Sequence, residues 1–248
     1  MFSALSALML ASTHRWGPLM SEQVETRSAS RVDAFVDAAF AFCMTLLVVA
    51  GGQLPQTLDD LTNALLRVPA FAVGFALLAL FWWAHHAFRT LHRRDDGTSL
   101  LLSLIIVFVI MIYVYPLRLL GESTAYYISG RTLPGSPVVQ TVGDMRVLYV
   151  VYGVGFIVLS ALYILLYRHA ARHAADPKIR HIAGTTAGHW FICGFVGLVS
   201  VLLAVFLPRD DPWSAGIPGM AYMLIPVLIL PYMAIVNRPS RRPVPAEA

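Results

Sequence analysis

The stretch RVDAFVDAAFAFCMTLLVV, residues 31–49, decides the class of fold. It is long and apolar enough to cross a bilayer as a helix, because about 20 apolar residues span about 30 Å of hydrocarbon. Its front end nevertheless carries Arg31, Asp33 and Asp37. Charged groups inside a membrane helix are costly and normally face protein or water. Asp37 therefore indicates that this helix does more than anchor the chain.

The composition of the whole chain predicts an integral membrane protein. Of its 248 residues, 58% are hydrophobic and 13% are charged, whereas soluble domains are about 25% charged. Five further segments are long and apolar enough to span, so we predict an all-α fold with six transmembrane helices. The predicted spans are residues 32–51, 66–88, 98–120, 143–167, 186–207 and 214–236.

We expect one six-helix membrane domain, residues 31–237, between an N-terminal tail (1–30) and a C-terminal tail (238–248). Residues 52–65 and 121–142 are expected to be outside loops. Residues 168–182 are expected to be a basic cytoplasmic link in which Pro177 interrupts any continuous helix.

Basic residues are divided unequally between the two sides of the predicted membrane. Thirteen of the 18 lysines and arginines fall in one set of connections and tails. The other five are Arg67, Arg118, Arg131, Arg146 and Arg209. The positive-inside rule then places both termini in the cytoplasm and the protein in the cell (inner) membrane. This orientation explains the net charge of +4 without a nucleic-acid partner.

Polar residues of the first three spans are predicted to lie at one depth. Asp37, the pair His85 and His86, and Ser103 are each on the order of 5–9 Å from the cytoplasmic boundary, at 1.5 Å per residue. A carboxylate, two imidazoles and a hydroxyl at one level can satisfy one another. Arg31 lies about 120° around the helix from Asp37 and is expected to reach headgroups or another helix.

Another face of the first span is a nearly apolar stripe that carries one hydroxyl group. Its members recur at spacings of three, four and seven residues, which places them on one side of a helix. They are Phe35, Ala38, Phe42, Thr45, Leu46 and Val49. By itself, such a stripe is more often a packing face than a pore lining.

These residues resemble the bacterial homologues of the lysosomal transmembrane protein 175 potassium channels. That family opens its first helix with R-x-x-x-F-S-D, continues with a run like A-I-x-x-T-L-L-V, and carries W-x-x-H-H near the end of its second helix. The matching residues are Arg31, Phe35, Val36, Asp37, Ala41, Phe42, Thr45, Leu46, Leu47, Val48, Trp82, His85 and His86. A basic turn (Arg93, Arg94) and Pro116 extend the resemblance to about residues 31–120.

The resemblance implies a potassium-permeable cation channel, without enzymatic activity, metal or cofactor, in which four copies of the chain surround a pore lined by the first helix. Its partners would be potassium and other monovalent cations, the lipid bilayer and three further copies. The chain, like the family, has no TVGYG filter. The constriction would instead be an apolar ring, which can gate by dewetting.

The resemblance also assigns roles to particular residues. Phe42 would form the constriction, Thr45 a hydroxyl layer, and Leu46 and Val49 the next apolar layers. The supporting polar residues behind the helix would be Arg31, Asp37, His85, His86 and Ser103.

Three positions depart from the family pattern. Val36 stands where the motif has serine, Ser103 where the family often has asparagine, and Phe42 where isoleucine or leucine is usual. A phenylalanine ring could close the pore more tightly or attract cations by its faces. These changes also leave a non-conducting relative open.

Two further functions remain open on sequence alone. A proton-coupled secondary transporter would use Asp37, His85 and His86 as a relay within one subunit, although we find only weak signs of an internal repeat. A membrane metalloenzyme would need several histidine-rich boxes. His169 and His173 form the only such pair in the later cytoplasmic link, and a solvated basic turn explains them better.

Overall fold

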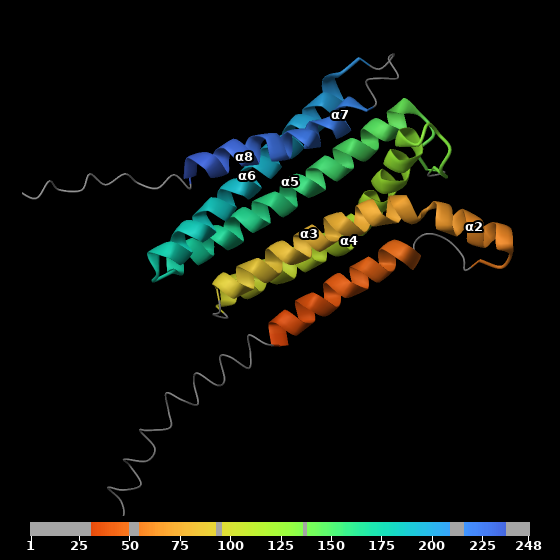
Figure 1. Cartoon of the computed structure of the whole chain (residues 1–248). Helices are drawn as coiled ribbons and strands as arrows, with labels where there is room; N and C mark the ends of the chain where they lie inside the picture. Colours follow the sequence, from red (N-terminus) through yellow and green to blue (C-terminus); the bar gives the residue numbers. More distant parts are fainter. Residues whose placement is uncertain (1–30, 50–54, 93–95, 136–137, 209–215, 237–248) are drawn as a thin grey trace, which may run out of the picture. The chain divides into compact units, whose positions relative to one another are not determined.

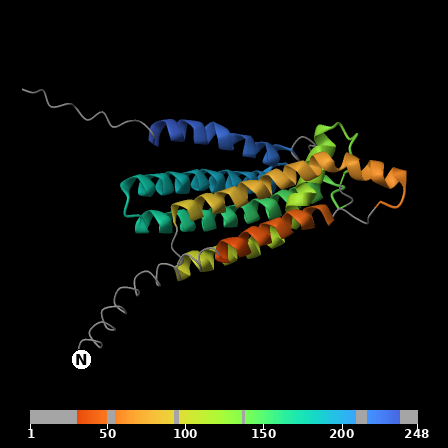
Figure 2. The ribbon, with the colours of Figure 1, turned by 60° about the horizontal axis from the view of Figure 1, so that its bottom comes forward.

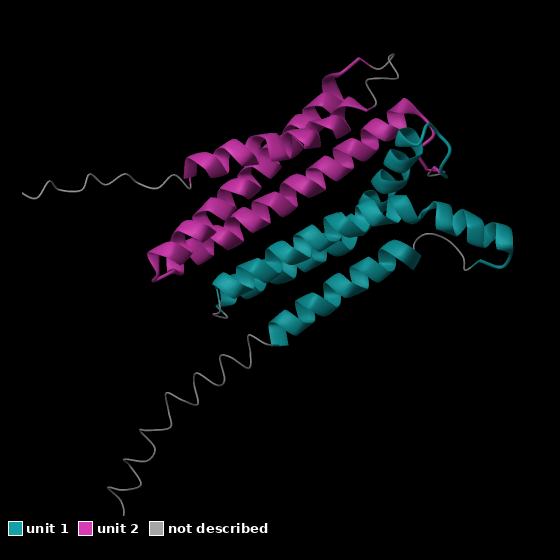
Figure 3. Ribbon diagram, viewed as in Figure 1, with its two compact units in different colours: residues 1–134 teal, residues 135–248 magenta. Residues whose placement is uncertain are grey.

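The computed structural model describes residues 31–49, 55–92, 96–135, 138–208 and 216–236 (Figure 1). Both predicted tails, the basic turn at Arg93 and Arg94, and Arg209 lie outside these ranges. The described part folds into two compact units, residues 1–134 and 135–248 (Figure 3). Each unit is described by itself.

Helices make up the regular structure throughout the described residues, and six of them are long and apolar enough to cross a membrane. These six spans are Arg31–Val49, α3 (Val68–Leu91), α4 (Gly97–Ile128), α5 (Val142–His173), α6 (Pro177–Phe206) and Ile217–Val236. The last consists of α7 (Ile217–Met220), a 3₁₀ turn (Ala221–Met223) and α8 (Leu224–Val236). The prediction of an all-helical, six-span protein is therefore confirmed.

The first unit contains the Arg31–Val49 helix, α2 (Leu58–Leu66), α3 and α4. Helices α3 and α4 approach closely because Gly121 carries no side chain: a Cβ there would lie 2.7 Å from the carbonyl oxygen of Ala70. Gly74 similarly leaves room for Leu47, whose Cδ2 would be 2.9 Å from an added Cβ. Small residues of this kind let membrane helices pack closely.

The predicted outside loop at residues 52–65 is partly wrong, because it contains helix α2. Thr57 caps this helix through its hydroxyl, which accepts from the backbone N–H of Asp60 at 3.1 Å. The carboxylate of Asp60 accepts in return from the N–H of Thr57 at 3.0 Å. This reciprocal capping box starts a helix even in a short connection.

Three of the predicted spans are shorter than the helices in the structure, which are α4, α5 and α6. Helix α4 continues to Ile128, so residues 121–128 of the predicted loop are helical, and the chain turns at Gly130 and Arg131, both with positive φ. Helices α5 and α6 leave only residues 174–176 between them. Pro177 begins α6, so it does separate two helices, as predicted. Asp176 caps α6, because its side chain accepts a hydrogen bond from the backbone N–H of Lys178 at 2.8 Å.

The second unit is built on an antiparallel hairpin of α5 and α6, which lie side by side in both views (Figures 1 and 2). Tyr163 stacks on Trp190 with ring centroids 4.4 Å apart. The guanidinium of Arg146 donates to the carbonyl oxygens of Leu207 and Pro208 at 2.6 and 2.7 Å, which ties the start of α5 to the end of α6.

We predict that Gly121→Ala lowers the melting temperature of the detergent-purified protein. The added Cβ meets a backbone oxygen that cannot rotate away, so one helix must shift, at a cost of about 1–3 kcal/mol. Gly97→Ala, in the same helix, is the matched control because its Cβ meets nothing within 4 Å. An equal loss in both variants would contradict this account of the α3–α4 contact.

Candidate functional site

The Arg31–Val49 helix buries one face and exposes another. Val36, Phe40, Cys43 and Leu47 are buried, with at most 3% of each residue exposed. Their spacing of three and four residues makes them one continuous stripe. Through this stripe the helix packs on its own unit, and Leu47 reaches Gly74 of α3.

The exposed face of this helix is the stripe that the sequence singled out as a pore lining. Phe42 is 52% exposed and Val49 is 63% exposed. Thr45 is also exposed, and Leu46 is half-buried. The chain itself therefore leaves Phe42, Thr45 and Val49 largely uncovered, so the face is available to lipid, to water or to further copies of the chain.

Thr45 supplies the only hydroxyl group on this exposed stripe. Its Oγ1 donates a hydrogen bond to the carbonyl oxygen of Ala41 at 3.0 Å. Bonding to the preceding turn commits the hydroxyl proton and leaves the oxygen lone pairs turned outward as acceptors. An acceptor oxygen in this position can contact a cation.

Asp33 and Arg89 form an ion pair between the first helix and α3. The Nε of Arg89 donates to Oδ1 of Asp33 at 2.5 Å, with side-chain exposures of 7% and 39%. This contact was not predicted from the sequence, where Arg89 is one of the thirteen basic residues expected on the cytoplasmic side. The available signal was spacing: Asp33 is one turn before Asp37, and Arg89 is one turn after His85.

Asp37 accepts a hydrogen bond from the indole Nε1 of Trp82 at 2.8 Å. The ring of Trp82 stacks on His86, with centroids 5.5 Å apart and planes 25° apart. The structure thus joins Asp37 and His86 through an intervening tryptophan. Sequence reasoning had used Trp82 as part of the W-x-x-H-H motif but not as a hydrogen-bond donor.

His85 and Ser103 form a buried contact between α3 and α4. Nε2 of His85 lies 2.9 Å from Oγ of Ser103, and the two residues are 3% and 0% exposed. The hydroxyl of Ser103 donates to the carbonyl oxygen of Ser99 at 2.8 Å. Its single proton is therefore used, so His85 is the donor at Nε2.

The predicted polar group therefore divides into separate contacts. Among its five members, only His85 and Ser103 are hydrogen-bonded to each other; Asp37 and His86 meet through Trp82. Arg31 is exposed at the start of the helix and has no ion-pair partner within the described part of the chain. The proposed supporting role of the group stays a prediction.

A second charged cluster fastens the opposite end of the same unit. Glu122, which is only 4% exposed, accepts from Arg118 at 3.0 and 2.7 Å and from Arg67 at 3.3 Å. A buried carboxylate needs such partners. The contact ties the α2–α3 junction to α4, and sequence reasoning missed it because Glu122 lay in a predicted loop.

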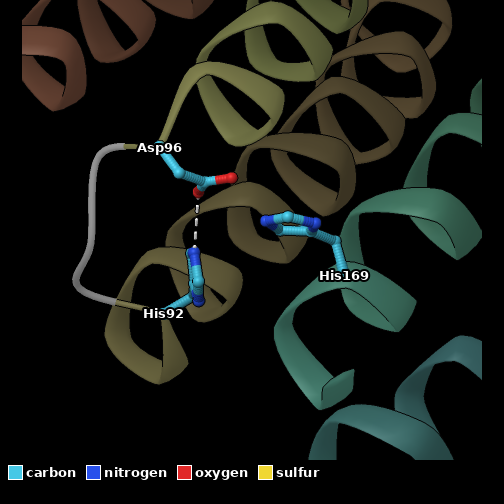
Figure 4. A group of neighbouring side chains, drawn as sticks. All are labelled: His92, Asp96 and His169. Atoms are coloured by element: carbon cyan, nitrogen blue, oxygen red, sulfur yellow. Dashed lines mark hydrogen bonds and ion pairs between the residues drawn. The ribbon is translucent and has the colours of Figure 1, made fainter. Parts of the chain in front are cut away.

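His92 at the end of α3 and Asp96 before α4 form another acid–base contact. Nε2 of His92 lies 3.0 Å from Oδ1 of Asp96, as the dashed line in Figure 4 marks. His169, also drawn there, belongs to α5 of the other unit. In that unit, the ring of His169 lies 4.3 Å from that of His173, so the predicted histidine pair does meet.

Fold and site together define a polytopic α-helical membrane protein whose first helix is held by one face. Residues 31–116 match the profile of the family described as endosomal/lysosomal potassium channel TMEM175. The chain is 26% identical over 227 residues to a potassium channel of Marivirga tractuosa, covering 87% of this chain and 91% of that one. It is 27% identical over 172 residues to a potassium channel of Chamaesiphon minutus, covering 65% and 77%.

Two solved structures share the fold. A variant of the potassium channel MtTMEM175, in complex with a nanobody–MBP fusion, superposes with a TM-score of 0.72 at 23% identity, covering 84% of this chain and 94% of that one. A TMEM175 homologue from Chamaesiphon minutus gives 0.54 at 22% identity, covering 85% and 99%. The chain thus resembles the TMEM175 channels in sequence over residues 31–116 and shares their fold, as its motifs predicted.

We predict that Asp33→Asn destabilises the protein by about 1–3 kcal/mol, because it removes a charged partner from the buried guanidinium of Arg89. Thermal melting in detergent measures the loss. Asp59→Asn, the same change on exposed helix α2, is the matched control and should melt like wild type. Equal melting of wild type and Asp33→Asn would show that the ion pair does not hold the first helix.

Proposed function

We propose that the chain is a subunit of a potassium-permeable cation channel whose pore is lined by the Arg31–Val49 helix. One observation carries the proposal: Phe42, Thr45 and Val49 are exposed while the neighbouring stripe of the same helix is buried in its own unit. The potassium channels of Marivirga tractuosa and Chamaesiphon minutus, similar over most of this chain, support potassium as the ion.

Four copies of the chain are proposed to surround one axis, with the exposed stripes facing one another. The number four rests on the family resemblance. Such an arrangement covers the exposed stripe with identical stripes, and it turns the hydroxyl of Thr45 toward a water-filled path rather than toward lipid. A polar group at this depth is expected to face protein or water.

In this arrangement the four Phe42 rings form the narrowest layer of the pore. An apolar ring excludes water when narrow, and a small widening is enough to wet it, so it can act as a gate. The ring faces also attract cations electrostatically. The layers beyond it are the hydroxyls of Thr45, followed by the side chains of Leu46 and Val49.

The residues behind the helix are proposed to fix its rotation and depth. Arg31, Asp37, His85, His86 and Ser103 were the predicted set, and the ion pair between Asp33 and Arg89 joins them. In this role the polar residues hold the apolar layers in register and do not touch the ion.

Both termini are proposed to lie in the cytoplasm, with the chain in the cell (inner) membrane. The excess of arginine and lysine in alternate connections supports this orientation. The ion pair of Asp33 and Arg89 then lies toward the cytoplasmic face, and the cluster around Glu122 lies toward the outer face.

A proton-coupled transporter is supported less well by these contacts. A relay needs groups that both take and give protons, and the partner of Asp37 is the indole N–H of Trp82, which is a donor only. The proton of Ser103 is committed to Ser99. No enzymatic activity forms part of the proposal.

The test is potassium flux into liposomes that contain the purified protein. We predict that Phe42→Ala raises the flux about tenfold, equivalent to a barrier lower by about 1.4 kcal/mol, because it removes the constriction. Wild type should favour potassium over sodium. Phe108→Ala is the matched control, since Phe108 is 64% exposed but lies on α4, away from the proposed pore.

Two outcomes would contradict the proposal. An equal rise in Phe108→Ala would mean that loosened packing, rather than a widened constriction, causes the flux. Absence of potassium flux in both wild type and Phe42→Ala, with the protein folded in the liposomes, would remove the channel function.

A further inference from the structure

A groove of about 1060 Å³ lies in the second unit, along α5, α6 and α8. One end is basic: Arg168 and Arg172 come from the last turns of α5, and Arg180 comes from the first turn of α6. The rest of its wall includes Ile164 and Phe191. Arg180 and Phe191 are 11 residues apart on one helix, which corresponds to roughly 16 Å.

The three arginines carry charge that the described residues do not neutralise. Arg168 and Arg172 are exposed and have no ion-pair partner in the part of the chain that the structure describes. Arg180 donates only to the backbone carbonyl of Ala174, at 3.0 Å. The adjacent carboxylate of Asp176 accepts from the backbone N–H of Lys178 as the cap of α6. The basic end therefore offers donors for an anion.

The groove combines this anion-binding end with an apolar wall. Guanidinium groups match the geometry of phosphate oxygens and bind them through paired N–H groups. A free anion would use only the basic end, whereas a phospholipid would also cover the apolar wall with an acyl chain. Basic pockets between helices on the cytoplasmic side of a membrane are suited to anionic headgroups.

We propose that this groove binds one anionic phospholipid of the cytoplasmic leaflet. Its phosphate is held by Arg168, Arg172 and Arg180, and one acyl chain lies along Ile164 and Phe191. The inference rests on the proposed function only for the orientation that puts these arginines in the cytoplasm. It needs no pore and no ion.

Two glycines on α6 allow the groove to be filled without changing its charge. A Cβ added at Gly184, which lines the groove, would meet nothing within 4 Å, so a larger side chain there occupies open space. Gly188 differs, because its Cβ would lie 2.0 Å from the hydroxyl of Tyr232 on α8. Gly184→Leu therefore fills the groove between Arg180 and Phe191 and leaves the contact of Gly188 with Tyr232 unchanged.

The test is native mass spectrometry of the detergent-purified protein with added phosphatidylglycerol or phosphatidylcholine. We predict a retained phosphatidylglycerol adduct on wild type and an adduct on Arg168→Gln and on Arg180→Gln that is about tenfold weaker, or about 1.4 kcal/mol. Lys178→Gln is the matched control, since it removes one charge from the first turn of α6 without lining the groove. It should bind like wild type.

The Gly184→Leu variant distinguishes binding of a lipid from binding of a free anion. It keeps every arginine and should still lose the phosphatidylglycerol adduct, and millimolar inorganic phosphate should not displace the lipid from wild type. The proposal would be overturned by equal retention of phosphatidylcholine, by an equal loss in Lys178→Gln, by full binding in Gly184→Leu, or by displacement with phosphate. None of these results bears on potassium flux, so the channel proposal would stand or fall separately.

Discussion

The ion pair between Arg89 and Asp33 sets how the Arg31–Val49 helix is rotated about its own axis. The guanidinium of Arg89 is only 7% exposed, and taking a charged partner away from a buried charge is costly. Shifting the helix by one residue would turn Asp33 by about 100° away from α3. The same rotation would pull Phe40 and Leu47 out of the buried stripe. The electrostatic contact and the apolar packing therefore select one rotation, and that rotation leaves Phe42 and Thr45 exposed.

A second group of charged residues fixes helices to one another at the far end of the first unit. Glu122 is held by Arg118 and Arg67, so the junction of α2 and α3 is fixed to α4. Beside this cluster the two helices are in close contact, with Gly121 against the backbone of Ala70. Paired charges and small residues at helix contacts suit a membrane, where neither unpaired polar groups nor loose packing is compensated by water.

The number and order of the spanning helices could be predicted from the sequence. A helix that crosses a bilayer needs a long apolar segment, and such segments are easy to recognise in a sequence. The helix ends could not be predicted, since they depend on polar residues that hydropathy counts against a helix. Thr57 and Asp60 start α2 through their caps, and Glu122 continues α4 because two arginines neutralise it. The spacing of the residues predicted the stripe on the first helix, but the spacing alone could not show that this stripe is exposed. Asp37 was expected beside histidines, and its indole partner, Trp82, was missed because Trp82 was noted as part of the W-x-x-H-H motif but not as a hydrogen-bond donor.

The proposed channel function depends most on whether the exposed face of the first helix lines a path for ions. Cadmium block of potassium flux in the Thr45→Cys variant tests this most directly, since several thiolates around one axis bind a soft divalent cation together. We predict rapid block of Thr45→Cys, with wild type and Phe108→Cys unaffected. Potassium flux through Thr45→Cys that cadmium leaves unchanged, or block of Phe108→Cys instead, would contradict a pore lined by this helix.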